Sequence, residues 1–351
     1  MTTSPTEALD TERLLDYIQS RLGGVSGPLR LEQFTVGQSN PTFRVTASNG
    51  WRCVLRKKPA GVLLPSAHAV EREFRVITAL HAVGFPVARP ILLCEDSAVI
   101  GTPFYLMEFV EGRGLWEQAL PGMAPAERHA IWDELNNVMA RLHALDFRAL
   151  GLSDYGKTGN YLQRQIARWS RQYRSTDTDR IEAMDRLIEW LPLNIPPGDE
   201  TTVVHGDFRL DNVIFHPTEP RILAVLDWEL STLGDPMADF AYLATSWHMP
   251  TSIFPSIAGL DHRALGIPLE REFVEAYCRR RGRPVIDPAV WNYYIAFSLF
   301  RIAAIAHGVG RRAHDGNASN AAAAEVGRKA GPIAQVAWSL VERMVRGGVT
   351  V

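Results

Sequence analysis

Residues 203–240 read VVHGDFRLDNVIFHPTEPRILAVLDWELSTLGDPMADF, the most informative stretch of the chain. An apolar strand (TTVVH) runs through a glycine to Asp207, which places this carboxylate at the mouth of a loop. Asn212 follows five residues later, and two strand-like runs, VIFH and RILAVLD, bring Asp227 to a strand end. The stretch therefore predicts a compact strand–loop–strand unit over residues 202–229 that presents three oxygen-bearing side chains.

These three side chains have the chemistry that phosphoryl transfer requires. The reaction needs one group that orients the attacking hydroxyl, and oxygen ligands that hold a metal ion against the phosphates. An amide and a carboxylate oxygen, from Asn212 and Asp227, suit Mg²⁺. Asp207 then accepts the proton of the substrate hydroxyl. A lone Asp in a turn is usually a cap or a turn-former, but here the spacing, the flanking strands and the later GDPxxD agree.

The residues before this stretch form a β-rich region with one inserted helix. Asp10 is placed to cap a short helix (TERLLDYIQSRL), and strand-like runs begin at residue 29. The pair Asn49-Gly50 predicts the tip of a hairpin, and AHAVEREFRVITALHAVG has helical spacing and ends at Gly84. The runs PILLCEDS and TPFYLMEFVEG read as two further strands.

From Pro125 onward the pattern becomes helical, beginning with the amphipathic run AERHAIWDELNNVMARLHALD. The sequence EGRG at residues 111–114 looks like a hinge between the two parts. We therefore predict an α+β fold with an N-terminal helix and lead-in (1–28), a β-rich nucleotide-binding lobe (29–112) and a mainly helical catalytic and substrate lobe (113–351).

The composition is that of a globular protein. The chain has 351 residues, of which 46% are hydrophobic and 22% charged, enough for a two-lobed enzyme. A formal net charge of -2 gives no reason to expect nucleic acid or a membrane surface as a partner. The most apolar stretch, residues 290–306, is short for a membrane span and contains Asn292 and Arg301, so we expect a buried core helix.

Three widely spaced cysteines without a CxxC pair argue against a disulfide framework or a zinc site. The N-terminal residues MTTSPTEALD lack the basic start and apolar core of a secretory signal. Both observations favour a cytoplasmic location.

The HGDxxxxN pattern of residues 205–212 resembles the catalytic core of the aminoglycoside phosphotransferase-like superfamily, which shares the protein-kinase fold. The resemblance extends over residues 31–306. More narrowly, LRKKPAGVLLPSAHAVEREFRV and DWELSTLGDPMADFAYL resemble a branch that includes the kinase-like module found upstream of certain acyl-CoA dehydrogenases. The resemblance implies a protein-kinase-like two-lobe fold, ATP as phosphoryl donor and Mg²⁺ as cofactor.

The resemblance also implies roles for individual residues. The catalytic base is Asp207, and the magnesium ligands are Asn212 and Asp227. His205 fixes the catalytic loop. Asp235 and Asp239 tie the loop after the second metal ligand to a helix start through backbone hydrogen bonds.

In the β-rich lobe, the run GQSNPTF occupies the place of the family's phosphate loop. Ser39 and Asn40 offer donors to phosphate oxygens there, although the run alone would read as an ordinary polar turn. The resemblance further places the backbone of Glu108 and Val110, in FYLMEFVEG, at the adenine edge.

The following strand, WRCVLRKK, puts Arg56 where the family usually has a lysine. Arginine keeps the charge and can fork two phosphate oxygens, but it is longer and bulkier. Glu73 is the expected helix partner of this cation. Glu71 lies about 200° around the helix from Glu73, so one of the two is expected to be solvated.

The charge balance of the C-terminal part favours an anionic acceptor. Residues 236–351 contain 13 Lys and Arg against 9 Asp and Glu, with basic clusters CRRRGR and GRR. Arg301 and His307 lie on the apolar helix, where each is placed either to line a cleft or to make a polar core contact. The Pro-containing segment 247–266 is either a substrate lid, which we favour, or a helix connector.

The leading hypothesis is a kinase for a hydroxyl of a small molecule, such as a hydroxy acid or hydroxyacyl-CoA. An aminoglycoside or antibiotic kinase would require an acidic cleft for its polycationic substrate. A nucleotide-binding pseudokinase is the third alternative. Arg56 supports it, whereas the presence of Asp207, Asn212 and Asp227 together argues against it. A protein kinase is disfavoured because no DFG or APE segment is recognisable. The acceptor, the oligomeric state and the choice between ATP and GTP stay open.

Overall fold

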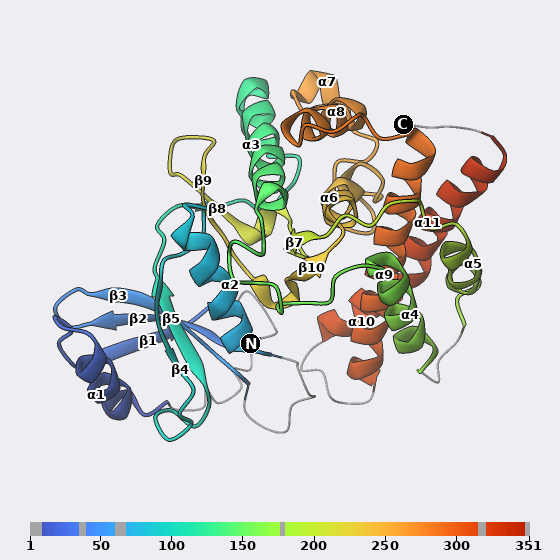
Figure 1. The fold of residues 1–351 in the computed structure, drawn as a ribbon. Helices are drawn as coiled ribbons and strands as arrows, with labels where there is room; N and C mark the ends of the chain where they lie inside the picture. The colour runs from blue at the N-terminus through green and yellow to red at the C-terminus, as the bar shows by residue number, and fades with distance from the viewer. Residues whose placement is uncertain (1–8, 35–39, 60–67, 176–179, 315–320, 348–351) are drawn as a thin grey trace. The chain divides into compact units, whose positions relative to one another are not determined.

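The computed structural model describes residues 9–34, 40–59, 68–175, 180–314 and 321–347 (Figure 1). The chain divides into two compact units. The first comprises Met1–Arg113 and Leu223–Glu229, and the second comprises Gly114–Ile222 and Leu230–Val351. The α+β class predicted from the sequence is confirmed, because the first unit is built on a β-sheet and helices dominate the second.

The first unit is a five-stranded antiparallel sheet with strand order β1-β2-β3-β5-β4 and two helices. The strands are β1 (Leu29–Gln33), β2 (Thr42–Ala47), β3 (Arg52–Lys57), β4 (Pro90–Cys94) and β5 (Phe104–Glu108), followed by the short β6 (Arg113–Gly114). The helices are α1 (Thr11–Arg21) and α2 (Val70–Ala82). Most of β9 (Ile222–Val225) also belongs to this unit.

Two local predictions in this unit are confirmed. The β2–β3 hairpin turns at Asn49-Gly50, where Gly50 has a φ of 84°, a left-handed conformation that glycine adopts without a steric penalty. Asp10 caps α1, since its carboxylate accepts the N–H of Arg13 at 3.0 Å.

Helix α1 is an integral part of the core of the first unit, rather than a separate lead-in. Leu14 and Ile18 of α1 are fully buried in one cluster with Val45 of β2 and Leu55 of β3. These two side chains recur four residues apart, so they lie on one face of the helix and close that side of the core.

The second unit is mainly helical. Its helices are α3 (Pro125–Ala144), α4 (Tyr161–Arg174), α5 (Glu182–Trp190), α6 (Pro236–Ala244), α7 (His262–Leu265), α8 (Glu270–Arg280), α9 (Pro288–His314), α10 (Ala321–Arg328) and α11 (Ala330–Val345). Its short strands are β7 (Thr202–Val204), β8 (Val213–Phe215) and β10 (Thr232–Gly234), and β7 pairs antiparallel with β10. Single 3₁₀ turns occur at Leu191–Leu193, Leu210–Asn212 and Thr245–Trp247.

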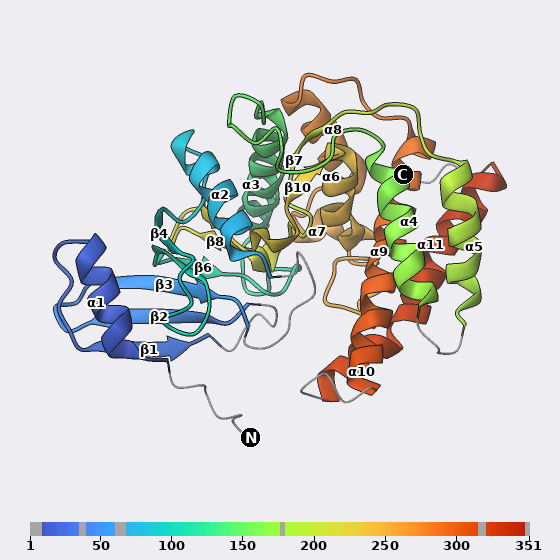
Figure 2. The same ribbon diagram turned by 60° about the horizontal axis from the view of Figure 1, so that its bottom comes forward.

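Helix α9 is the central helix of the second unit, where it contacts α4, α5, α6, α10 and α11 (Figures 1 and 2). Among the described residues, the segment Pro288–Arg311 alone is long and apolar enough by composition to cross a membrane, with a hydropathy of 1.3. However, most of this segment is buried inside the fold, including the polar residues Asn292 and Arg301. The helix packs as the core helix that the sequence predicts.

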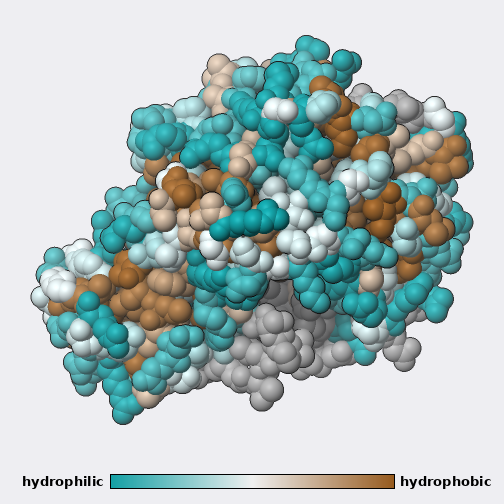
Figure 3. All heavy atoms as spheres, in the orientation of Figure 1, coloured by the Kyte–Doolittle hydropathy of each residue, from teal (hydrophilic) through white to brown (hydrophobic). Residues whose placement is uncertain are grey.

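The surface shows few large apolar side chains. The most exposed of them are scattered along the described chain, and Figure 3 shows brown areas that are broken up by hydrophilic atoms on the visible face. They include Trp116, Leu193, Val285 and Val345. Such scattered exposure is normal for a globular protein.

The packing of α1 predicts that Leu14→Ala destabilises the protein by about 3 kcal/mol, since it removes a buried side chain and leaves a cavity. Urea unfolding measures this change. Leu193→Ala is the matched control, because Leu193 is 84% exposed and its loss should change the free energy of unfolding little. Equal effects of the two variants would contradict the assignment of α1 to the core.

Candidate active site

The catalytic loop follows β7 and turns sharply at Gly206. This residue has a φ of 84°, and a Cβ placed on it would lie 2.7 Å from the carbonyl oxygen of Leu230. Every other residue would therefore be strained and would clash with backbone. The turn delivers Asp207 directly after the strand, as the motif predicts.

Asp239, on α6, holds this loop through its buried carboxylate. Oδ2 accepts the N–H of His205 at 2.7 Å, and Oδ1 accepts the N–H of Gly206 at 2.8 Å. The ring of His143, from α3, lies 3.2 Å from Oδ2. Burial acts to raise the pKa of Asp239, but the His143 contact and the backbone N–H groups outweigh it, so that the pKa lies below the ordinary value. The sequence predicted that Asp239 ties the loop after Asp227; in the structure it ties the catalytic loop instead, because α6 packs against β7.

The two other scaffold residues act locally. Nδ1 of His205 accepts the N–H of Asp207 at 3.1 Å, so the ring braces the loop from within. Asp235 caps α6 by accepting the N–H of Met237 at 2.7 Å, and the hydroxyl of Tyr294 donates to it at 2.9 Å.

Asn212 is bonded to Asp207 across the catalytic loop. Its Nδ2 donates to the Asp207 carbonyl at 2.8 Å and to Oδ2 of the carboxylate at 3.0 Å. Both amide hydrogens therefore point toward Asp207. Within the described residues, Oδ1 of Asn212 has no hydrogen-bond donor, so a hard oxygen is left available for a cation.

The carboxylate of Asp207 faces both positive charge and a buried phenol. Nε of Arg209 lies 3.5 Å from its Oδ1, and the side chain of Asp207 is 20% exposed. Burial raises the pKa of Tyr242, and the neighbouring Asp207 carboxylate raises it further through charge and a side-chain hydrogen bond. Tyr242 was not predicted from the sequence. The available signal is its position on α6, three residues after Asp239 and hence on the same helix face.

In the first unit, Arg56 of β3 lies close to three carboxylates. Its Nε lies 2.8 Å from Oε2 of Glu73, and its Nη2 lies 2.6 Å from Oδ1 of Asp227 and 3.5 Å from Oε2 of Glu229. Burial opposes the charge of Arg56, yet these carboxylates raise its pKa above the ordinary value. Glu71, by contrast, is partly exposed and pairs with Lys58 at 2.9 Å. Arg56 thus pairs with Glu73, the helix partner expected from the sequence.

Asp227 has an unusual backbone. Its φ of 62° is left-handed, which is uncommon for a residue with a side chain and costs about 1–2 kcal/mol. One carboxylate oxygen contacts Arg56, and among the described residues the other has no hydrogen-bond donor. Strained backbone of this kind is concentrated at functional sites.

The side chain of Asn40 is used inside the first unit. Its Nδ2 donates to Oε1 of Glu73 at 2.7 Å, and its Oδ1 lies 2.9 Å from Nδ1 of His68. The hydroxyl of Tyr105 donates to the other oxygen of Glu73 at 3.1 Å. A phosphate contact from Asn40 stays a prediction and would require these bonds to open. Ser39 lies outside the described residues.

The backbone N–H groups of Glu108 and Val110, at the end of β5 and just after it, differ in their hydrogen bonding. The N–H of Glu108 donates to the Arg89 carbonyl at 2.9 Å. The N–H of Val110 finds no acceptor in the described part of the chain. A contact of Glu108 and Val110 with adenine therefore stays a prediction.

Three of the four arginines in the basic cluster CRRRGR are paired with carboxylates. Arg280 lies 2.7 Å from Asp133, and Arg281 lies 2.6 Å from Glu200, which also faces Arg283 at 3.3 Å. These pairs join parts of the second unit that are distant in the chain. The charge count over residues 236–351 therefore does not by itself indicate an anionic acceptor.

Segment 247–266 is anchored at several points. The indole of Trp247 donates to the Pro268 carbonyl at 3.1 Å, and the N–H of Ile257 donates to the Ser246 carbonyl at 3.1 Å. Both Trp247 and Ile257 are buried. These contacts are those of a packed connector, and a role as a lid stays a prediction.

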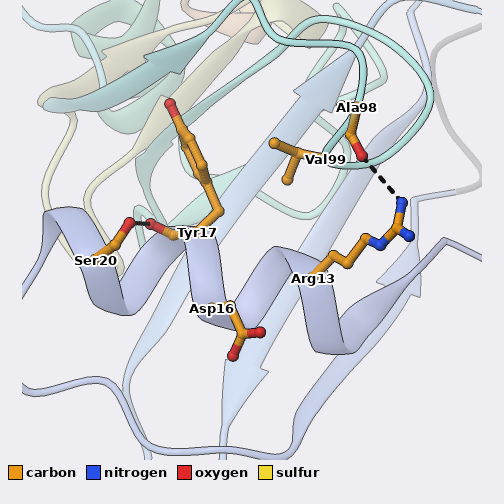
Figure 4. A pocket seen from close by; sticks show the side chains of 6 residues that line it. All are labelled: Arg13, Asp16, Tyr17, Ser20, Ala98 and Val99. Carbon is orange, nitrogen blue, oxygen red and sulfur yellow. Dashed lines mark hydrogen bonds between the residues drawn. The ribbon is translucent and has the colours of Figure 1, made fainter.

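A shallow hollow of about 350 Å³ lies beside α1, where Figure 4 shows the side chains that line it. They are Arg13, Asp16, Tyr17, Ser20, Ala98 and Val99. None of the predicted site residues lines it, and we assign it no function.

We expect Asp239→Asn to destabilise the protein by about 3 kcal/mol, because two buried N–H groups lose a charged acceptor. A lowered pKa means that the contribution of Asp239 is fully present above the unfolded value of about 3.9 and is lost as the pH falls below it. The difference from wild type in urea unfolding should therefore shrink below about pH 4. Exposed Asp16→Asn is the control; a pH-independent difference for Asp239→Asn would contradict the account.

Comparison with known proteins identifies the family. The model described as the phosphotransferase enzyme family matches residues 30–290. A mouse (Mus musculus) protein named acyl-CoA dehydrogenase family member 10 is 48% identical over 342 residues, which cover 96% of this chain and 32% of the relative. The chain thus spans about a third of that relative's length.

Solved structures agree with this match. A crystal structure from Ralstonia eutropha JMP134, named provisionally as an aminoglycoside phosphotransferase, has 52% identity and a TM-score of 0.86, covering 96% of this chain and 99% of that one. Spectinomycin phosphotransferase APH(9)-Ia, solved with ADP and spectinomycin, has a TM-score of 0.63 at 13% identity, covering 97% and 100% of the two chains, which shows a shared fold. The predicted kinase-like fold and the resemblance to the branch near acyl-CoA dehydrogenases are confirmed. This chain belongs to the phosphotransferase enzyme family.

Proposed function

We propose that the protein transfers the terminal phosphoryl group of ATP to a hydroxyl of a small anionic molecule, with Asp207 as the base. The observation that carries the proposal is the bonding of Asn212 to Asp207, which orients the carboxylate and leaves the amide oxygen of Asn212 available. ADP in the structure of the related spectinomycin enzyme supports a nucleotide donor.

The donor set fits Mg²⁺. Asn212 and Asp227 each offer an oxygen that no hydrogen-bond donor in the described residues occupies, and oxygen ligands are those that Mg²⁺ prefers. When bound with the nucleotide, the ion would neutralise charge on the phosphate oxygens. Within the first unit, Arg56 lies 2.6 Å from Asp227 and would supply a further positive charge beside the phosphates.

Asp207 would orient the acceptor and take its proton. Its Oδ2 is already held by Asn212, and its backbone N–H by His205, so the carboxylate cannot swing freely. Nε of Arg209 lies 3.5 Å from its Oδ1, and the Tyr242 hydroxyl also interacts with the carboxylate. A carboxylate oxygen has more than one lone pair, so a substrate hydroxyl can donate a further hydrogen bond to it.

The neighbourhood of Asp207 favours an anionic acceptor, such as a hydroxy acid or a hydroxyacyl-CoA. Arg209 and Arg301 border the catalytic loop, whereas a polycationic antibiotic would need acidic side chains there. The name of the mouse relative associates a similar sequence with acyl-CoA chemistry. An antibiotic kinase remains the second candidate, because the Ralstonia structure bears such a name.

We also propose a reducing, cytoplasmic setting. All three cysteines are buried free thiols, and burial raises the pKa of Cys53 to about 12, which disfavours the thiolate form.

Asp207→Asn should abolish phosphoryl transfer, with kcat reduced by about 10³-fold or more, because the base is lost while the loop bonds can remain. Release of ADP over a panel of hydroxy acids, their CoA thioesters and aminoglycosides measures the activity. Nucleotide affinity, followed by calorimetry, should change little. Undiminished turnover in the variant, or wild-type turnover with aminoglycosides alone, would overturn the proposal.

Arg56→Lys should weaken binding of a non-hydrolysable ATP analogue about tenfold, because a single ammonium cannot replace a planar fork that spans Glu73 and Asp227. Calorimetry in the presence of Mg²⁺ measures the affinity. Lys58→Met serves as the control, since Glu71, which is partly exposed, is the one described carboxylate that pairs with Lys58. Unchanged affinity in Arg56→Lys would show that Arg56 does not contact the nucleotide.

A further inference from the structure

Arg301 of α9 is a buried cation without a carboxylate partner. Its side chain is 6% exposed, and its Nη2 donates to the carbonyl of Gly206 at 2.6 Å. Its guanidinium carbon lies 5.0 Å from the ring centre of Tyr242 and 5.8 Å from that of Trp169. No carboxylate in the described chain pairs with it, and its buried Nε has no hydrogen-bond acceptor there. Buried charges are normally paired, so this arrangement requires an explanation.

Arg168 of α4 is a second cation beside the first. Its guanidinium carbon lies 5.0 Å from the ring centre of Trp169, the same indole that Arg301 contacts. Arg168 is exposed to solvent and has neither a hydrogen bond nor an ion pair with any described residue. Partial burial lowers the pKa of Arg168, and the positive charge of Arg301 lowers it further. Two neighbouring cations repel each other, so an anion placed between them and solvent would relieve the repulsion.

The nearby carboxylates are already committed elsewhere. Asp239 accepts the two N–H groups of the catalytic loop, and Asp235 caps α6 and accepts the Tyr294 hydroxyl. Neither carboxylate makes an ion pair with Arg168 or Arg301.

One of these two cations, Arg301, contacts the candidate catalytic loop. Arg301 is bonded to the carbonyl of Gly206, the residue immediately before Asp207. Tyr242 links the two sites, since its ring faces the Arg301 guanidinium and its hydroxyl interacts with the Asp207 carboxylate. Arg301 thus connects the candidate catalytic loop to Trp169, the indole that Arg168 also contacts.

We propose that Arg168 and Arg301 form an acceptor subsite that binds a carboxylate or phosphate group of the molecule to be phosphorylated. This inference rests on the proposed function and specifies the substrate class. Arg168, which is accessible, contacts the anion through its fork of N–H donors. Arg301 is a positioning residue, which supplies positive charge and holds the carbonyl of Gly206. The arginine-rich runs CRRRGR and GRR, which stand out in the sequence, contain neither Arg168 nor Arg301.

Arg168→Gln should raise KM for an anionic acceptor about 10- to 100-fold, the equivalent of one or two charge-assisted hydrogen bonds, and leave KM for ATP unchanged. Arg168→Lys should recover part of the loss because it restores the charge. Arg171→Gln is the matched control on the same helix; it removes an equal charge from an exposed position and should behave like wild type. A merely structural role of Arg168 would not distinguish charged from neutral acceptors.

The probes are hydroxybutyrates with the hydroxyl at each position, their methyl esters and their CoA thioesters, each studied by steady-state kinetics and by calorimetry without nucleotide. An effect on the free acids but not on the esters identifies a carboxylate as the bound group. An effect confined to the thioesters identifies the CoA phosphates. Equal effects of Arg168→Gln on acids, esters and thioesters, or equal effects of Arg171→Gln, would overturn the subsite.

Measurements of acceptor binding test this inference independently of the proposed function. If wild-type protein binds the acids or thioesters in preference to the esters, and Arg168→Gln abolishes the preference, the subsite stands even without turnover, and the proposed reaction fails alone. If turnover occurs without any preference for an anion, the reaction stands and the subsite fails. If no acid or thioester binds to wild type, the subsite is refuted.

Discussion

The buried carboxylate of Asp239 is the constraint on which the candidate catalytic loop depends. Taking a carboxylate out of water is costly unless donors replace the lost hydration. Here two consecutive N–H groups of the loop and the His143 ring provide those donors, so the charge and the loop conformation stabilise each other. Because Gly206 lies in a conformation that only glycine adopts easily, the loop has little freedom once Asp239 is in place.

In the first unit, the buried charge is a cation, and carboxylates surround it. Arg56 is 12% exposed and lies among Glu73, Asp227 and Glu229, which together carry more negative charge than it neutralises. This excess of negative charge agrees with the proposed binding of a divalent cation. The left-handed backbone of Asp227 fits the same interpretation, since strain persists where the surrounding contacts over-determine a conformation.

Much of this could be predicted from the sequence because it rests on local signals. Apolar periodicity, the Asn49-Gly50 turn and the cap at Asp10 indicate elements that the structure contains. The spacing of the HGDxxxxN motif likewise places Asp207 and Asn212 within one short loop, where they are bonded. Both kinds of signal depend on residues that are near one another in the chain.

The remainder depends on pairs that are distant in the chain and leave no local signal. His143 meets Asp239 across 96 positions, and Arg301 meets Gly206 across 95. A charge count likewise does not reveal which cations are paired, because Arg280 and Arg281 have partners 147 and 81 positions away. Arg168, which a count over residues 236–351 does not include, makes no ion pair with any described residue.

In the proposed reaction, Asp207 acts as a base in a direct transfer from nucleotide to acceptor. The stereochemical course at phosphorus tests it, using ATP made chiral at the terminal phosphate with isotopic oxygen and the best acceptor among the hydroxybutyrates and their thioesters. A single in-line displacement inverts the configuration, and inversion is the result that we predict. Retention would mean two displacements through a phosphorylated enzyme, with Asp207 as a nucleophile rather than a base, and would contradict the account.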